Sequence, residues 1–251
     1  MDPFLILAVA VINFFVAFIA ASVGGSGLVI TPVLLSLGVP APSAVAAKRF
    51  SNIGLTSISL LKFHREGKVI WRIGVPMIAV SVAAAYIAAN IVLTMDEVAL
   101  SRVIGAVIIG TILFMLINKK FGLEERARNM KKRNKALGGV FFFAAVFVSH
   151  ISGGGGGIFT SHVLIFFFGM TFLQAAGTRK ISGVVSTSVA VLVYILAGVI
   201  PFDIAIPLLV AGTAGGWFGS HYAIRKGDAW VRRLFMIVIS ILGIKLILFP
   251  A

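Results

Sequence analysis

Two glycine-rich runs interrupt long apolar stretches of this sequence at the same place in each half. Residues 24–27 read Gly-Gly-Ser-Gly, and residues 153–157 are five consecutive glycines. A basic pair follows each run by about twenty positions, Lys48 with Arg49 and then Arg179 with Lys180. Backbone breaks and charges this deep in hydrophobic sequence are typical of transport sites in membrane proteins.

The spacing of these landmarks indicates an internal repeat. Both the glycine runs and the paired arginines are separated by 130 positions. Farther along, the offset becomes 131, which pairs Pro76 with Pro207 and indicates one inserted residue between two otherwise ungapped halves. We therefore divide the chain into a first repeat, 1–118, a basic connection, 119–135, and a second repeat, 136–251.

The composition excludes a soluble globular protein. Hydrophobic residues make up 59% of the chain and charged residues 12%, so we predict an all-α polytopic integral membrane protein. The first apolar segment, 4–21, is expected to be retained as structure because it lacks the basic start of a signal peptide. The absence of cysteine excludes disulfides, thiolate metal sites and thiol catalysis.

The net charge of +14 is concentrated between the apolar segments. Sixteen of the 22 Lys and Arg residues fall in 62–72, 119–135 and 225–233, whereas 94–97 and 198–203 contain acids and no bases. We interpret the basic connections as cytoplasmic anchors that contact anionic membrane lipids, in preference to a nucleic-acid surface. The acidic connections and both termini are then expected outside the cell membrane.

The lengths of the apolar segments predict a specific plan for each repeat. Residues 28–38 and 158–169 are about a dozen each, which reach only about 18 Å and cannot span a hydrocarbon core of about 30 Å. Each repeat is therefore expected to open with a glycine-tipped broken or re-entrant hairpin, followed by three transmembrane helices. Five full crossings per half would also satisfy the loop charges. The predicted full helices are 43–61, 71–93 and 98–118 in the first half, and 174–197, 204–224 and 234–249 in the second.

These crossings make the two repeats inverted in the membrane, because the first would run from outside to inside and the second in the opposite sense. Inverted repeats are a common plan of secondary transporters. Their broken segments meet near the membrane midplane, where backbone amides and the positive ends of half-helices can receive an anion.

Four basic residues lie far from any predicted loop: Lys48, Arg49, Arg179 and Lys180. All eight acids of the chain fall at termini or predicted connections, so no nearby carboxylate neutralises them. A cation in the membrane core costs at least about 2.5 kcal/mol, which a bound anion could offset. The alternative is that their helices begin at the membrane surface and these side chains extend to lipid head groups.

Neutral donors cluster with these cations. Asn52 and Ser182 follow the paired arginines by three positions, on the same helical face. His150 and His162 flank the second glycine run and could donate to an anion or carry a proton, since histidine titrates near neutral pH. Neither metal-ligand spacing nor a catalytic Ser/His/acid set is visible, so we predict no enzyme, metal or cofactor. The remaining candidate substrate-binding residues are Gly24, Gly25, Ser26, Gly154, Gly155, Gly156 and Thr178.

The sequence resembles the TauE/SafE family of sulfite and organosulfur-anion exporters, which includes permeases similar to 4-toluene sulfonate uptake proteins. The residues that carry the resemblance are 23–27 with Pro32 and Gly38, then 46–48, 152–157 and 176–178. The resemblance implies an integral-membrane permease for small anions such as sulfite, thiosulfate, sulfoacetate or another sulfonate. Where the family often has Gly-Thr, this chain has Ala47 and Lys48, an exchange that favours an anionic ligand.

We therefore predict a secondary transporter that moves a small sulfur-containing anion across the cell membrane by alternating access. An anion channel, a lipid-binding structural membrane subunit and an intramembrane enzyme are the alternatives. The closely spaced glycines at 212, 215, 216 and 219 permit helix packing and a homodimer without requiring one.

Overall fold

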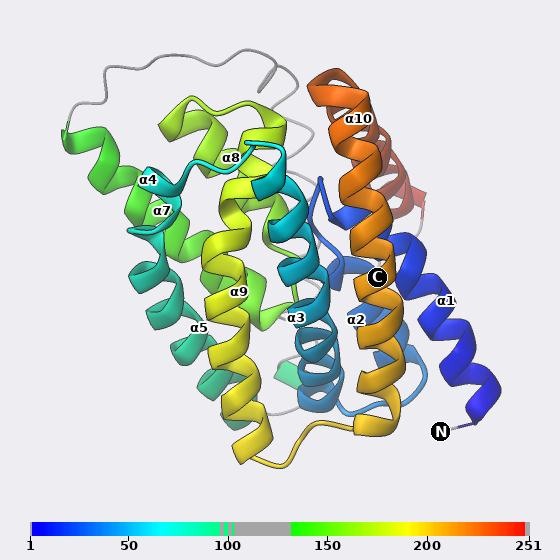
Figure 1. The fold of residues 1–251 in the computed structure, drawn as a ribbon. Helices are drawn as coiled ribbons and strands as arrows, with labels where there is room; N and C mark the ends of the chain where they lie inside the picture. Colours follow the sequence, from blue (N-terminus) through cyan, green and yellow to red (C-terminus); the bar gives the residue numbers. More distant parts are fainter. Residues whose placement is uncertain (1, 96–97, 100–101, 103–131, 249–251) are drawn as a thin grey trace.

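The computed structural model describes residues 2–95, 98–99, 102 and 132–248, and every regular element in these residues is an α-helix. This confirms the predicted all-helical fold (Figure 1). The helices are α1 (Pro3–Ala20), α2 (Gly27–Ser36), α3 (Ala41–Arg65), α4 (Trp71–Gly74), α5 (Met77–Thr94), α7 (Lys132–Ile151), α8 (Gly157–Phe168), α9 (Phe172–Leu196) and α10 (Phe202–Leu248).

The glycine runs break the helices in both halves. The turn between α1 and α2 contains Gly24, with φ +93°, and the turn between α7 and α8 contains its repeat partner Gly154, with φ +115°. Residues with a Cβ atom rarely adopt these backbone angles, so glycine allows the chain to leave one helix and start the next within a few residues. In Figure 1, α2 turns back beside α1, and α8 turns back beside α7.

The helices that follow the breaks are short, as predicted. α2 has 10 residues and α8 has 12, which correspond to about 15 and 18 Å, less than the hydrocarbon core of about 30 Å. Four described helical segments are long and apolar enough to cross a membrane: Pro3–Ala20, Met77–Thr94, Phe172–Leu196 and Phe202–Leu234.

The two 25-residue helices α3 and α9 occupy the centre of the molecule and pack against one another. They run in opposite directions, as Figure 1 shows. α3 also packs against α10, and α9 against α5, so each central helix is covered by a helix of the other half. The opposite directions are what inverted repeats require of this pair. The inverted relation of the halves as wholes stays a prediction, because the predicted helix 98–118 lies almost entirely outside the described residues.

Two predicted boundaries differ from the structure. The predicted helix 71–93 is two helices, α4 and α5, separated at Val75 and Pro76, because proline lacks the N–H needed to continue a helix. The predicted connection 225–233 is helical within α10 except at Gly227, whose φ is 80°. The basic connection 119–135 is described only from Lys132, where α7 begins.

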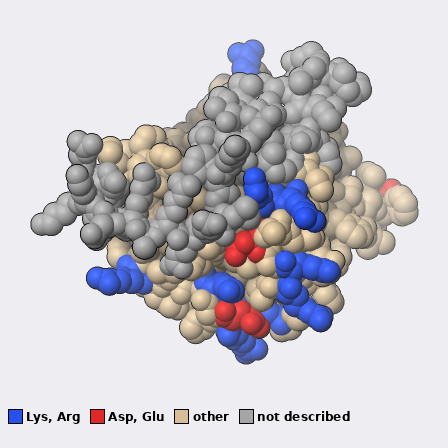
Figure 2. Space-filling model, turned by 90° about the horizontal axis from the view of Figure 1, so that it is seen from above, with Lys and Arg blue, Asp and Glu red and all other residues tan. Residues whose placement is uncertain are grey.

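Charged residues gather at one end of the molecule. Figure 2 shows many Lys and Arg side chains on the face at which α3 ends and α4 begins. The loop between α9 and α10, which precedes Asp203, lies at the opposite end (Figure 1). This separation agrees with the alternation of basic and acidic connections along the sequence. Which end faces the cytoplasm stays a prediction.

Candidate functional site

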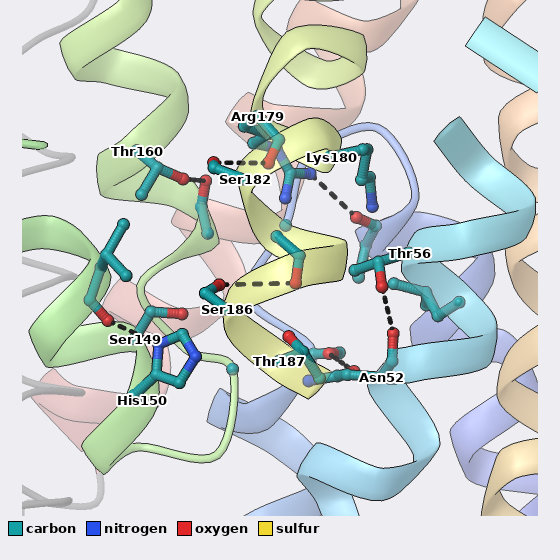
Figure 3. A pocket seen from close by; sticks show the side chains of 18 of the residues that line it. Asn52, Thr56, Ser149, His150, Thr160, Arg179, Lys180, Ser182, Ser186 and Thr187 are labelled. Carbon is teal, nitrogen blue, oxygen red and sulfur yellow. Dashed lines mark hydrogen bonds between the residues drawn. The ribbon is translucent and has the colours of Figure 1, made fainter. Parts of the chain in front are cut away.

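A cavity of about 60 Å³ lies where the two breaks meet α3, α7 and α9. One water molecule needs about 10–15 Å³ by this measure, so the cavity can hold several waters or one small ligand. Figure 3 shows polar side chains from α3, α7 and α9 gathered around it. The structure brings ten of the predicted site residues to its wall: Gly24, Gly25, Ser26, Arg49, Asn52, His150, Gly154, Arg179, Lys180 and Ser182.

The N-terminal ends of both short helices face this cavity. Gly25 and Ser26, which directly precede α2, line it, as does Gly157, the first residue of α8. The first N–H groups of a helix have no partner within the helix, and the helix dipole adds a partial positive charge at this end. Two such ends at one cavity favour a negatively charged ligand.

Lys180 supplies a charge without a partner. Its side chain is 1% exposed, and its ammonium has no hydrogen-bond partner among the described residues. Arg179 and Lys48 lie close enough to repel it, and the cavity wall contains no Asp or Glu among the described residues. A buried ammonium in these surroundings is destabilising by several kcal/mol unless a counter-charge binds or the amine gives up its proton.

The two arginines are already engaged, each with the other half of the chain. Arg49 on α3 donates through Nη2 to the backbone carbonyl of Ser149, near the end of α7. Arg179 on α9 donates through Nη2 to the carbonyls of Ala20 at 3.2 Å and Ser22 at 3.4 Å, at the end of α1. The Nε atoms of both arginines are buried and have no partner among the described residues.

Asn52 connects the two breaks to each other. Its Oδ1 accepts from the Ser26 hydroxyl at 3.2 Å, and its Nδ2 donates to the Gly153 carbonyl at 3.2 Å. The oxygen and the nitrogen of this side-chain amide therefore bind one break each, Ser26 at the first and Gly153 at the second. Its repeat partner Ser182 donates to the Arg179 carbonyl of its own helix at 3.2 Å.

Lys48 does not line the cavity, although the sequence places it beside Arg49. It is fully buried, and its Nζ donates to Asn13 Oδ1 on α1 at 3.0 Å. Asn13 Nδ2 donates in turn to the Leu208 carbonyl at 2.7 Å and to the Ser51 hydroxyl at 3.1 Å. Lys48 thus belongs to a polar network that joins α1, α3 and α10.

Four other predicted residues also lie away from the cavity wall. Thr178 accepts from the Ile70 amide at 2.9 Å, and His162 Nδ1 lies 2.9 Å from the Ile158 carbonyl on its own helix. The other two are Gly155, whose amide donates to the Ser152 hydroxyl at 3.1 Å, and Gly156, which packs against the backbone of Ala145 and Ser149.

His150 lines the cavity and breaks its symmetry, because its repeat partner is Ala20. Its Nδ1 lies 2.9 Å from the Val146 carbonyl, while its buried Nε2 has no partner among the described residues. Since a carbonyl can only accept, Nδ1 carries a hydrogen, and the neutral ring leaves Nε2 as an acceptor. A proton bound at Nε2 would convert it into a donor for an anion.

Apart from Ser149, whose carbonyl accepts from Arg49, four hydroxyl residues of the cavity wall are not among the predicted site residues. Two of them, Thr56 and Ser186, obey the 130-position offset and follow Asn52 and Ser182 by four residues. One further helical turn along the predicted faces would have found them. The other two, Thr160 and Thr187, have Ile30 and Ser57 as repeat partners, and only the structure places them. In the described residues, no group of three or more His, Asp or Glu is arranged to hold a metal ion.

Comparisons with known proteins match nearly the whole chain. The family model for the sulfite exporter TauE/SafE matches residues 9–246. The probable membrane transporter protein YfcA of Escherichia coli strain K12 is 25% identical over 240 residues, which cover 93% of this chain and 88% of that protein. The probable membrane transporter protein ORF9 of Sinorhizobium sp is 24% identical over 241 residues, with coverages of 94% and 90%. The comparison with solved structures gives no match.

Proposed function

This chain belongs to the TauE/SafE sulfite exporter family, and from that premise we propose that it moves a small sulfur-containing anion across the cell membrane by alternating access. The family and its relatives make the chain a multi-pass membrane transporter. Sulfite, sulfoacetate or another sulfonate would be the substrate. The basic face of Figure 2 would contact cytoplasmic lipid head groups, as the excess of Lys and Arg in cytoplasmic loops favours.

The observation that carries the proposal is the unpartnered ammonium of Lys180. It lines a cavity together with two arginines and the starts of two helices, and none of the described residues at this wall is acidic. Positive charge from side chains and helix ends therefore accumulates without a protein counter-charge. An anion small enough for about 60 Å³ of space supplies that counter-charge.

Alternating access is supported by where the cavity lies. Its wall combines residues of both halves, since Arg49 comes from α3 and Arg179 from the oppositely directed α9. Sites formed by broken helices between two halves are typical of secondary transporters, in which one half rocks against the other. A channel would use the same basic wall without closing around the ion.

The proposal is tested by reconstituting the purified protein in liposomes and measuring uptake of sulfite, sulfoacetate, thiosulfate, sulfate and chloride. We expect saturable uptake of a sulfur anion and little uptake of chloride. Uptake that rises linearly with concentration for all five ions would support the channel alternative. Folded protein that moves none of them would contradict the proposed substrate class.

A further inference from the structure

We propose a division of labour among the cations: Lys180 binds the transported anion directly, whereas Arg49 and Arg179 position the glycine breaks that form the rest of the site. This inference rests on the proposed function for its ligand. It departs from the expectation, drawn from the sequence, that all the buried basic residues bind the anion in the same way.

The two arginines make equivalent contacts across the halves. Arg49 follows the first break in the chain but donates to Ser149 at the second. Arg179 follows the second break but donates to Ala20 and Ser22 at the first. Each central helix therefore holds the break of the opposite half, and the two arginines are themselves repeat partners.

The acceptors explain why arginine is suited to this position. α1 and α7 end at the breaks, where the last carbonyls carry the partial negative charge of the helix. The carbonyls of Ala20 and Ser149 accept from the amides of Gly24 and Gly154, and a carbonyl oxygen can accept a second hydrogen bond. A guanidinium can donate to two carbonyls at once, as Arg179 does with Ala20 and Ser22. These carbonyls partly compensate both guanidinium charges before any ligand binds.

Glycine leaves the room that this arrangement needs. A Cβ atom at Gly157 would lie 3.1 Å from Nη1 of Arg179 and 3.3 Å from the Cα of Gly24. The Arg179 guanidinium thus lies between the first residue of α8 and the end of α1. If the guanidinium moved away, both the start of α8 and the end of α1 would lose a contact that holds them in place.

Lys180 differs from the arginines in its hydrogen bonds and in its repeat partner. Its ammonium has no partner among the described residues, and its repeat partner is Phe50, so the first half supplies no equivalent cation. Lys48 is also buried but donates to Asn13. Within the part of the chain that the structure describes, Lys180 is the cavity-lining cation with no hydrogen bond, and an anion would be its first partner.

The anion-binding role of Lys180 and the positioning role of the arginines predict opposite effects of substitution on the stability of the ligand-free protein. Removing an uncompensated buried charge stabilises a protein. Removing either guanidinium instead takes charge-assisted hydrogen bonds away from the carbonyls at the breaks, which destabilises it. We would measure the melting temperature of detergent-purified wild type, Lys180→Met, Arg49→Gln and Arg179→Gln, with and without sodium sulfite or sulfoacetate at constant ionic strength. Lys226→Met and Arg225→Gln remove exposed charges of the same types and serve as matched controls.

We expect Lys180→Met to melt above wild type and to lose the stabilisation by the anion. Arg49→Gln and Arg179→Gln should melt below wild type, yet keep that stabilisation with a half-saturating concentration within about 3-fold of wild type. In liposomes, these arginine variants should lose maximal rate with little change in KM, and Arg179→Lys should restore part of the rate.

Arginine variants that keep their melting temperature but lose the anion response would overturn the division of labour, as would a Lys180→Met protein that still responds to the anion. If neither anion stabilises or enters through the wild type, the proposed substrate class fails. The order of melting temperatures without ligand still decides the positioning role of the arginines in that case.

Discussion

Gly24 lies directly against Gly157, so that a Cβ atom at Gly24 would be 2.7 Å from the Gly157 carbonyl carbon. The two breaks of the chain therefore touch through their backbones. Gly27 repeats the contact in reverse, since a Cβ atom there would come within 2.6 Å of the Gly153 carbonyl carbon. A cavity that presents backbone from both halves depends on this close approach.

Gly24→Ala should destabilise the protein by at least about 2 kcal/mol, because it adds both a backbone clash and strain at φ +93°. Gly38→Ala is the matched control, since Gly38 has φ +78° and no atom within 4 Å of the added Cβ. Strain alone should reduce its stability by only about 1 kcal/mol. Thermal unfolding in detergent compares the two, and equal losses would mean that the contact between the breaks contributes nothing.

Asn13→Ala should destabilise the protein by about 3–5 kcal/mol, because it removes the acceptor that Lys48 uses in the core. The double variant Asn13→Ala with Lys48→Met removes the buried charge together with its partner and should recover part of this loss. A double-mutant cycle measured by thermal unfolding gives the coupling. If the effects of the Asn13 and Lys48 substitutions on stability simply add, the hydrogen bond between these two residues contributes nothing.

Anion binding should strengthen as pH falls, because a proton on His150 Nε2 creates a donor towards the cavity. Proton and anion then favour each other's binding by linkage. Sulfoacetate keeps a constant charge between about pH 6 and pH 8, so its affinity reports on the protein. This dependence of affinity on pH should disappear in His150→Gln. It should persist in His162→Gln, because His162 lies away from the cavity wall. If the pH dependence is unchanged in His150→Gln, a group other than His150 binds the proton.

Thr56→Val should change the KM for the transported anion by less than about 3-fold. The Thr56 hydroxyl lines the cavity, but it donates to the Asn52 carbonyl at 2.6 Å and has no second hydrogen for a ligand. Ser186→Ala tests the repeat partner, whose bond to the Gly183 carbonyl is longer, at 3.4 Å. A loss of 10-fold or more in Thr56→Val would show that its hydroxyl turns to the anion.

The breaks and the long helices could be predicted from sequence because their causes are local. The glycines end α1 and α7 through their own backbone angles, and the predicted helices 43–61 and 174–197 correspond to α3 (Ala41–Arg65) and α9 (Phe172–Leu196). Residue counts likewise showed that α2 and α8 are short.

The partners of the buried cations could not be predicted, because they depend on which helices cross. Lys48 and Lys180 look alike in sequence, yet Asn13 from α1 accepts a hydrogen bond from Lys48, while Lys180 lines the cavity. The sequence likewise contains no sign that Arg49 turns to the end of α7. Thr56 and Ser186 could have been predicted, because they obey the repeat offset and lie one helical turn beyond Asn52 and Ser182.

The central claim is that this chain carries a small sulfur anion by alternating access, and counterflow tests it most directly. Liposomes preloaded with unlabelled sulfite or sulfoacetate would receive the same labelled anion outside, with wild-type protein or Lys180→Met. The account predicts that preloading accelerates wild-type uptake and that Lys180→Met loses this uptake. Wild-type uptake that is unaffected by preloading and does not saturate, or no uptake by folded protein, would contradict it.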